Sequence, residues 1–268
     1  HHFGAGLVRS LENFGVKGDP PSHPELLDWL AVEFRQQGWD TQRLLKTILM
    51  SATYRQSSAA PEAMFQADPR NELLARATRF RLPAEFIRDG ALAIAGTLDP
   101  RVGGPSVYPR QPHGLWREIS HFGYTKPFSA QAFYPSDGTG QNRRSMYTFW
   151  KRTSPPPSMM IFDSAKREVC VARRDSTSTP LQALVLLNDV QFMEAARVLA
   201  ERVIIEHPED AGAPGRSTAR IAAAFRRLTG RRPRPDEAML LDELWAEERV
   251  AFDADPEAAL LVASTGES

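Results

Sequence analysis

The chain has 268 residues, of which 42% are hydrophobic, so it is long and apolar enough to bury a sizeable core. Its 33 basic and 33 acidic residues cancel, which excludes a global attraction to nucleic acid or to an anionic membrane surface. A single cysteine excludes an internal disulfide framework, and no Cys or His spacing matches a structural zinc site.

The first helix signals follow a short N-terminal segment. Ser22 and Glu25 have the spacing of a capping box, in which both side chains satisfy amides at a helix start. The apolar period then predicts a helix over residues 23–37, which Gly38 would stop in a left-handed conformation. Asp40 suits the N-cap of a second helix, and the short connection predicts antiparallel packing of the two helices.

Two further helix starts are predicted before residue 100. Asp68-Pro69 predicts a third helix, and Pro83 predicts a fourth that ends at Gly96. The fourth helix has an apolar stripe that we expect to face inward, formed by Ile87, Ala91 and Ile94. Residues 1–99 are therefore expected to form a helical bundle.

The pattern changes in residues 100–178. Proline and glycine interrupt this stretch so often that only residues 145–151 are compatible with a short strand. Its aromatic content argues against disorder, because such side chains are depleted in disordered segments. We expect an ordered coil; the aromatics are Trp116, Phe122, Tyr124, Phe128, Phe133 and Tyr134.

Helical signals return in residues 179–252. Thr179 and Gln182 have the spacing of a second capping box, and the apolar stripe that follows is interrupted at Asn188-Asp189. Two more helices are predicted over residues 219–228 and 235–250, and residues 253–268 are expected to form a tail whose last five residues are polar. The predicted fold is mainly α: one domain in which a helical bundle is crossed by a long ordered coil with at most short strands.

The coil contains a concentration of arginine and aromatic side chains. The chain as a whole has 28 Arg against 5 Lys, and guanidinium groups favour planar, forked contacts with carboxylate, sulfate or phosphate. Such groups would hold a polyanion or a sugar; alternatively, they would cap helix ends and bind internal carboxylates. The candidate ligand-binding residues are Arg143, Arg144, Tyr147, Trp150, Arg152, Arg173 and Arg174.

Candidate catalytic groups are sparse. Asp163 and Glu168 would form a carboxylate pair for acid/base catalysis; alternatively, both would form structural ion pairs with the surrounding arginines. Cys170, between arginines, would be a thiolate only if His113 or His121 served as its base, and otherwise a small buried hydrophobe.

Two histidines near the N-terminus complete the candidates. His2 adjoins His1, but neighbouring side chains point to different sides, so the pair is a poor chelator and we expect no metal site. His23 lies at the first turn of a helix, where it would act in acid/base chemistry or only cap and pack.

Seven ordered blocks carry a family resemblance: HHFGAGLVRSLENFG, PPSHPELLDWLA, SATYRQSS, YPRQPHGLW, RRSMYTFWKRTSPPPSMMIFD, REVCVARR and TPLQALVLLND. The chain resembles the planctomycete-type family named domain of unknown function 1553 from His1 to about Arg202, with GRRPRPDE as a weaker continuation. The resemblance implies a piece of a large exported protein of Planctomycetes or Verrucomicrobia. In such proteins a related domain precedes this one, and a neighbouring domain often carries a c-type haem.

No activity is established for that family, so the resemblance supplies no catalytic residue. No C-x-x-C-H occurs here, which leaves any covalently attached haem to a neighbouring domain. One hypothesis is a domain that binds or processes an anionic glycan, such as a sulfated or acidic polysaccharide. The other is a non-catalytic scaffold that docks onto the preceding domain. We expect no nucleic acid partner, because charge is neutral and no recognition signature is present. No segment approaches the roughly 20 apolar residues of a membrane span.

Overall fold

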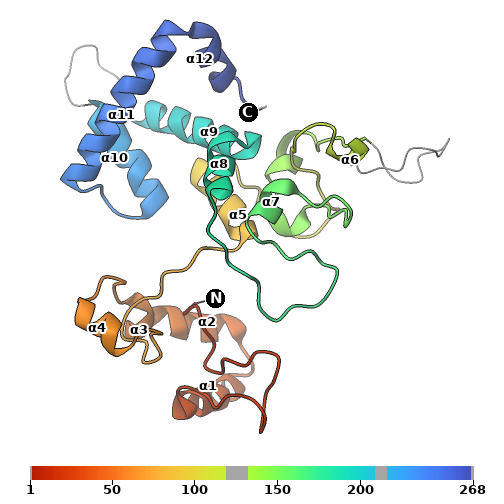
Figure 1. Cartoon of the computed structure of the whole chain (residues 1–268), viewed down its shortest axis with the longest axis vertical. Coiled ribbons are helices and arrows are strands. Elements are labelled where there is room, and N and C mark those ends of the chain that lie inside the picture. Colours follow the sequence, from red (N-terminus) through yellow and green to blue (C-terminus); the bar gives the residue numbers. More distant parts are fainter. Residues whose placement is uncertain (1, 119–131, 209–215, 267–268) are drawn as a thin grey trace, which may run out of the picture. The chain divides into compact units, whose positions relative to one another are not determined.

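The computed structural model describes residues 2–118, 132–208 and 216–266 (Figure 1). The chain forms two compact units: unit 1 contains residues 1–81 and 171–173, and unit 2 contains residues 82–170 and 174–268. Within the described residues, β pairing is limited to three isolated bridges, so the mainly α class is confirmed. Several residues named above lie outside the described ranges, namely His1, His121, Phe122, Tyr124 and Phe128.

Unit 1 begins with helices whose ends follow the sequence signals. They are α1 (Pro24–Gln36), α2 (Thr41–Met50), α3 (Ala52–Arg55) and α4 (Glu62–Ala67). The Asp40 carboxylate accepts the N–H of Arg43 at 3.0 Å, which confirms the predicted N-cap of α2. Gly38 has a φ of 71°, the left-handed conformation predicted for the end of α1.

Two predicted start signals in unit 1 were wrong. The Ser22 hydroxyl contacts Nδ1 of His23 at 3.0 Å, and His23 is the N-cap of α1 without a side-chain cap bond. Asp68 follows the end of α4, where its carboxylate accepts the N–H groups of Glu72 and Leu73 at 2.9 Å each. A carboxylate can cap a turn as well as a helix, so the residue type alone does not distinguish the two.

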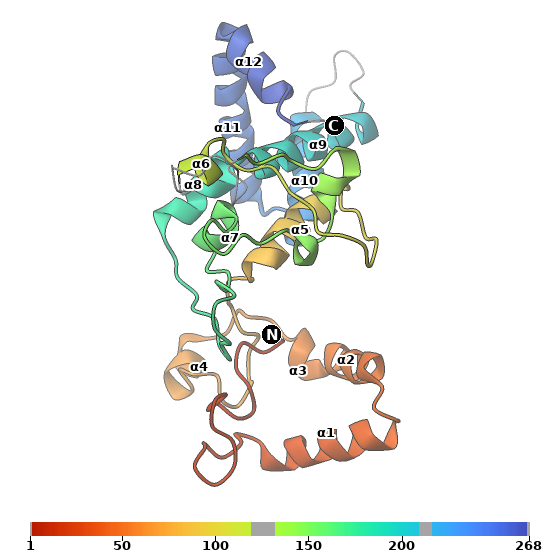
Figure 2. The same cartoon turned by 90° about the vertical axis from the view of Figure 1, so that its right-hand side faces the viewer.

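The expected packing of unit 1 was also wrong. The helix α2 packs against α3 and not against α1, which lies apart from it in Figure 2. No residue of α1 to α4 is buried. A buried guanidinium anchors the corner after α4 instead: Arg76 donates to the carbonyls of Asp68 at 2.7 Å and Pro69 at 3.2 Å, and lies 4.4 Å from the centroid of the Phe65 ring.

Unit 2 contains the longer helices. Their bounds are α5 (Ala84–Ala95), α6 (Leu115–Glu118), α7 (Pro157–Ile161), α8 (Pro180–Asn188), α9 (Val190–Glu206), α10 (Arg216–Thr229), α11 (Pro235–Ala254) and α12 (Pro256–Ala263). The central helix α9 packs against α5, α8, α10 and α12, and α10 packs against α11 (Figures 1 and 2). Buried apolar side chains include Ala84, Met159, Phe162, Leu199 and Val203.

The C-terminal half largely follows the predicted helices. The break between α8 and α9 falls at Asp189, whose carboxylate accepts the N–H of Gln191 at 2.9 Å. The second capping box was wrong: Thr179 makes no side-chain cap bond, and the Gln182 amide donates instead to the carbonyl of Ile161 at 3.0 Å. Residues 256–263, expected in the tail, form α12. None of the helices in the described residues is long and apolar enough to cross a membrane.

The expected coil is ordered where the structure describes it. It contains two short 3-10 helices, η1 (Gly138–Asn142) and η2 (Ser145–Tyr147), so the strand predicted over residues 145–151 was wrong. Val107 bridges Thr148 in parallel, donating to the Tyr147 carbonyl and accepting from the Phe149 N–H, both at 2.8 Å. In the described part of the coil, isolated bridges replace a ladder, so side chains must fix most of it.

Candidate functional site

Arg143, the first residue of the predicted arginine cluster, holds separate segments of the coil together. Its side chain is buried, donates to the carbonyls of Pro105 at 3.0 Å and Arg101 at 3.3 Å, and also donates to the Gly103 carbonyl. Its guanidinium lies 3.9 Å from the centroid of the Tyr147 ring, and the Tyr147 hydroxyl accepts the Gly103 N–H at 2.7 Å. The side chains of Arg143 and Tyr147 therefore form hydrogen bonds with backbone groups of this chain.

A second guanidinium, which the sequence did not single out, joins α5 to this coil. Arg88 is 4% exposed and donates to the carbonyls of Gln141 at 2.5 Å and Arg143 at 2.9 Å. Its Nε donates to the Gln191 side-chain oxygen on α9 at 2.6 Å. Burial lowers the pKa of Arg88 to about 10, and the charges of Asp89 and Asp189 oppose that shift. The group stays charged at neutral pH.

The neighbour of Arg88 closes the same network. The Asp89 carboxylate accepts both the N–H of Ser145 at 2.7 Å and its hydroxyl at 2.6 Å. Ser145 has 0% exposure. The sequence contains one indication of this network, namely that Arg88 is a charged residue within an apolar helical pattern. The neighbouring apolar stripe of α5 drew attention away from it.

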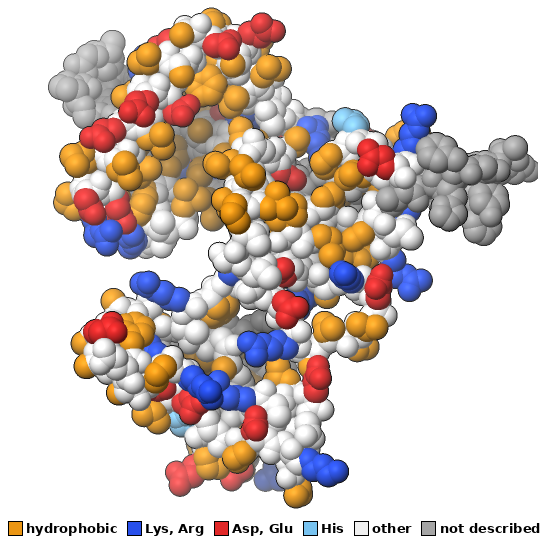
Figure 3. All heavy atoms as spheres, viewed as in Figure 1, with side chains coloured by type: hydrophobic (Ala, Val, Ile, Leu, Met, Phe, Trp, Pro, Cys, Tyr) orange, Lys and Arg blue, Asp and Glu red, His pale blue; other side chains and the backbone are white. Residues whose placement is uncertain are grey.

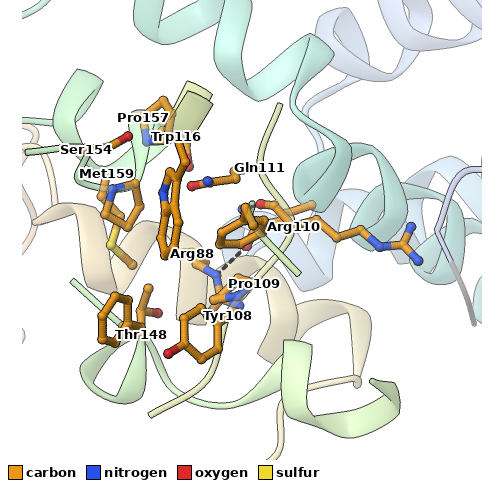
Figure 4. A pocket seen from close by; sticks show the side chains of 15 residues that line it. Arg88, Tyr108, Pro109, Arg110, Gln111, Trp116, Thr148, Ser154, Pro157 and Met159 are labelled. Carbon is orange, nitrogen blue, oxygen red and sulfur yellow. Dashed lines mark hydrogen bonds between the residues drawn. The ribbon is translucent and has the colours of Figure 1, made fainter. Parts of the chain in front are cut away.

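The coil aromatics form a cluster around a small cavity. Tyr108 stacks on Phe149 with centroids 4.8 Å apart, and the buried Trp116 meets Phe133 edge-on at 5.2 Å. Lys151 lies 4.5 Å from the centroid of Trp116, and burial lowers the pKa of this lysine. In Figure 4 the Trp116 ring stands among the lining residues, while the Arg110 side chain points away.

That cavity has a volume of about 20 Å³. This is room for one water molecule and not for a sugar or a nucleotide. Its wall includes the buried hydroxyl of Thr148 and the amide of Gln111, whose buried Oγ1 and Nε2 atoms have no hydrogen-bond partner. The aromatic cluster is thus a packing solution around a water-sized space.

The other predicted ligand-binding residues are dispersed. Arg174 donates to Glu85 at 2.7 Å; burial raises the pKa of Glu85, but the hydrogen bond and charge of Arg174 outweigh it, leaving a net lowering. The Trp150 Nε1–H donates to the Lys166 carbonyl at 3.1 Å, and Arg167 covers the Trp150 ring at 4.5 Å. The remaining three are exposed: Arg144 and Arg152 in unit 2, and Arg173 in unit 1. None of the seven lines a cavity described here.

Asp163 has a structural position. Its φ is 57°, and its carboxylate accepts the N–H of Thr177 at 2.8 Å and the Thr177 hydroxyl at 2.9 Å, which closes the loop before α8. Cys170 and Glu168 are exposed, so the alternative of a buried hydrophobic Cys170 was wrong. In the described residues no group of three or more His, Cys, Asp or Glu side chains is placed to hold a metal ion.

An apolar hollow of unit 2 is a groove between helices. It has a volume of about 650 Å³, and α5, α8, α9, α10 and α11 supply its walls. Figure 3 shows hydrophobic side chains gathered around a hollow beside α10 and α11. The stripe Ile87, Ala91 and Ile94, predicted to face the core, lines this groove, and of the three Ile87 also packs against the buried core cluster of Ala84, Met159 and Phe162. The buried residues of α5 are Ala84, Arg88, Leu92 and Ala95.

The two candidate histidines lie in unit 1 on the wall of a separate hollow of about 600 Å³. The His2 ring meets Tyr54 edge-on with centroids 5.9 Å apart, and Nδ1 of His23 contacts the Ser22 hydroxyl. The structure thus brings His2 and His23 to one cavity, although 20 residues separate them in the chain. Nothing in their local sequence predicted this.

Comparison with known proteins gives a family and no activity. No curated protein and no solved structure matches the chain. A family model described as protein of unknown function DUF1553 (PSD1) matches residues 1–245. That match covers most of the 268 residues and includes both units, so the chain belongs to the DUF1553 family.

Proposed function

We propose that this chain is a non-catalytic docking module whose unit 2 groove binds an amphipathic helix of the preceding domain of the same polypeptide. The observation that carries the proposal is the apolar lining of the groove. Phe86 is 57% exposed, Leu228 59% and Trp245 43%, all on its rim. Burying one such side chain fully stabilises a complex by about 1.5–3 kcal/mol before ordering costs.

The groove is long enough to bind a helix. Its floor carries the small residues Gly90, Ala91, Ala196, Ala200 and Ala224, which let another backbone approach closely. The 12 residues of α5 and the 17 of α9 run along it, lengths that correspond to roughly 18 and 25 Å at 1.5 Å per residue. About three to four turns of a bound helix would therefore fit, with anchors spaced at i, i+3, i+4 and i+7.

The polar content of the groove favours a peptide partner over a small polar substrate. Among the described residues that line the groove, Arg220 is the one charged residue, and this guanidinium donates to the His207 carbonyl at 2.9 and 3.0 Å. Substrate sites combine an apolar wall with several convergent polar groups. An amphipathic helix needs none, because its own backbone is satisfied internally.

The test is calorimetric titration of this chain with the separately expressed preceding domain. Ala200, exposed within the groove, is changed to Glu, and Ala246→Glu on the exposed face of α11 is the matched control. Ala200→Glu is expected to weaken binding at least about tenfold, since a charge would be buried against apolar groups, and the control should leave affinity unchanged. Equal affinities for both variants, or no heat of binding with the unmodified chain, would remove the proposal.

A second candidate, binding of an anionic glycan, is favoured by the exposed Arg144 and Arg152. Its test is titration with heparin and with neutral dextran: salt-sensitive binding to heparin alone, lost in the Arg144→Gln, Arg152→Gln double variant, would support it. Indifference to both polymers would exclude it. Export and a c-type haem in a neighbouring domain stay predictions.

A further inference from the structure

The hollow of unit 1 has features that the docking function does not use. Its volume of about 600 Å³ falls within the range of small-molecule sites, which is about 300–1,000 Å³. The N-terminal segment, the start of α1, the end of α2 and the 70–80 loop supply its wall. All these segments belong to unit 1.

Aromatic and aliphatic side chains make up much of the wall. Phe3, Trp29 and Phe80 contribute rings, and Leu26 and Leu30 of α1 add aliphatic surface. Trp29 is 51% exposed and Phe80 44% exposed, so these rings are open to an incoming group. A flat apolar body would bury them by stacking or edge contacts.

The described wall residues include more positively charged than negatively charged side chains. Arg9 and Arg70 both approach the same oxygen of Glu72, at 3.4 and 3.9 Å, and Glu72 is the only acidic side chain among the wall residues that the structure describes. On the wall itself, one carboxylate between two guanidinium groups leaves one positive charge in excess; Asp68, which does not line the wall, also attracts Arg9. The Arg9 side chain is 39% exposed and that of Arg70 76% exposed, so their donors remain within reach of a ligand.

The two histidines add fixed polar groups. The ring of His2 is held edge-on to Tyr54, and Nδ1 of His23 is engaged by the Ser22 hydroxyl at 3.0 Å. A ligand would therefore meet His23 through Nε2.

The wall is held in place by bonds between distant segments. The Thr78 hydroxyl donates to the Phe3 carbonyl at 2.9 Å, and the Ser22 N–H donates to the Leu7 carbonyl at 2.8 Å. Gly4 has a φ of 76°, and a Cβ there would lie 2.7 Å from the Thr78 methyl group, so only glycine fits this contact. A wall fixed in this way loses little entropy when a ligand binds.

We infer that the unit 1 hollow binds a small anion with a flat apolar body, of the aromatic carboxylate class. The rings and leucines take the apolar body, and Arg9 and Arg70 take the carboxylate by charge-assisted hydrogen bonds. The excess positive charge selects the anion over its neutral analogue. This site is independent of the groove in unit 2.

The test uses 2-naphthoate and its neutral analogue 2-naphthamide as probes of the full chain, followed by ¹H–¹⁵N spectra. Naphthoate is expected to shift the amides of residues 4–7 and 71–74 and to bind at least about tenfold more tightly than naphthamide, with affinity falling as salt rises. Arg9→Gln should weaken naphthoate about tenfold and leave naphthamide unchanged. Arg35→Gln, at the exposed end of α1 and away from the wall, is the matched control and should change neither.

Arg9→Lys keeps the positive charge but loses the two-pronged hydrogen bonding of the guanidinium group. It should therefore bind naphthoate more tightly than Arg9→Gln but less tightly than the unmodified chain. If Arg9→Gln loses its native spectrum, the more exposed Arg70→Gln replaces it. Equal affinity for both probes, shifts confined to unit 2, or naphthoate affinity unchanged in the glutamine variant would each overturn the inference. Failure of naphthoate to bind leaves the docking proposal intact, because that proposal is measured on groove variants.

Discussion

Buried guanidinium groups hold the non-helical parts of this protein together at the scale of single residues. Arg76 in unit 1, and Arg88 and Arg143 in unit 2, each donate to two or more backbone carbonyls. A coil without a β ladder leaves carbonyl oxygens to satisfy, and the five donors of arginine suit that task. The sequence marked the arginine-rich coil as special, but the same chemistry serves an external anion and an internal carbonyl equally well.

Removing Arg88 should destabilise unit 2 strongly. Arg88→Met keeps much of the side-chain volume but leaves the carbonyls of Gln141 and Arg143 without their donor and removes the positive charge beside Asp89, a change that typically costs about 3–5 kcal/mol. Urea unfolding followed by tryptophan fluorescence measures the loss. Arg249→Met, on an exposed arginine of α11, is the control and should stay within about 0.5 kcal/mol. A loss below about 1 kcal/mol for Arg88→Met would contradict the assigned role.

The turn between α10 and α11 should respond to acid. The side-chain hydrogen bond from Arg231, with the Arg234 N–H, lowers the pKa of Glu237 to about 2. A carboxylate with a folded pKa below its unfolded value of about 4.3 stabilises the fold above that value, and this contribution is lost as pH falls toward 2. Amide exchange at the first turn of α11 should therefore accelerate between about pH 4 and pH 2. Glu237→Gln should lack this pH dependence, and identical profiles would refute the assignment.

At the scale of elements, caps decide whether the exposed helices of unit 1 persist. Asp40→Ala removes the acceptor for the Arg43 N–H and should destabilise α2 by about 0.5–2 kcal/mol. Ser22→Ala should leave α1 unchanged, because the Ser22 hydroxyl engages His23 and not a helix amide. Amide exchange rates in the two helices measure both effects. Faster amide exchange in α1 of the Ser22→Ala variant would mean that Ser22 does cap α1, as the sequence suggested.

The same scale shows how far sequence reasoning reaches. Local signals located α1, α2, α5 and the α8–α9 break, because a cap or a left-handed glycine acts within a few residues. They failed where a side chain had a distant partner: Gln182 bonds the Ile161 carbonyl, 21 residues away, in place of a capping box. The stripe of Ile87, Ala91 and Ile94 was recognised as apolar, but periodicity cannot tell a core face from a groove wall.

At the scale of the whole molecule, the two units differ in how their helices are buried. Unit 2 centres on α9, where Ala195, Leu199 and Val203 are buried, whereas α1 to α4 of unit 1 contain no buried residue. Helices with few buried contacts open locally at low free energy. The helices α1 and α2 should therefore open more readily than α9, whereas a hydrogen bond ties the N-terminal segment of the unit 1 hollow to its 70–80 loop.

Native-state hydrogen exchange should therefore separate the units. Amides of α9 and of the buried face of α5 are expected to exchange only through global opening, while those of α1 and α2 exchange through local opening that costs several kcal/mol less. Low urea should accelerate α9 but leave α1 almost unaffected, because local opening exposes little surface. Addition of 2-naphthoate should slow exchange in α1 and α2 but not in α9, since binding stabilises only the closed state of unit 1. Equal protection in both units without ligand would mean that helix burial does not control their stability.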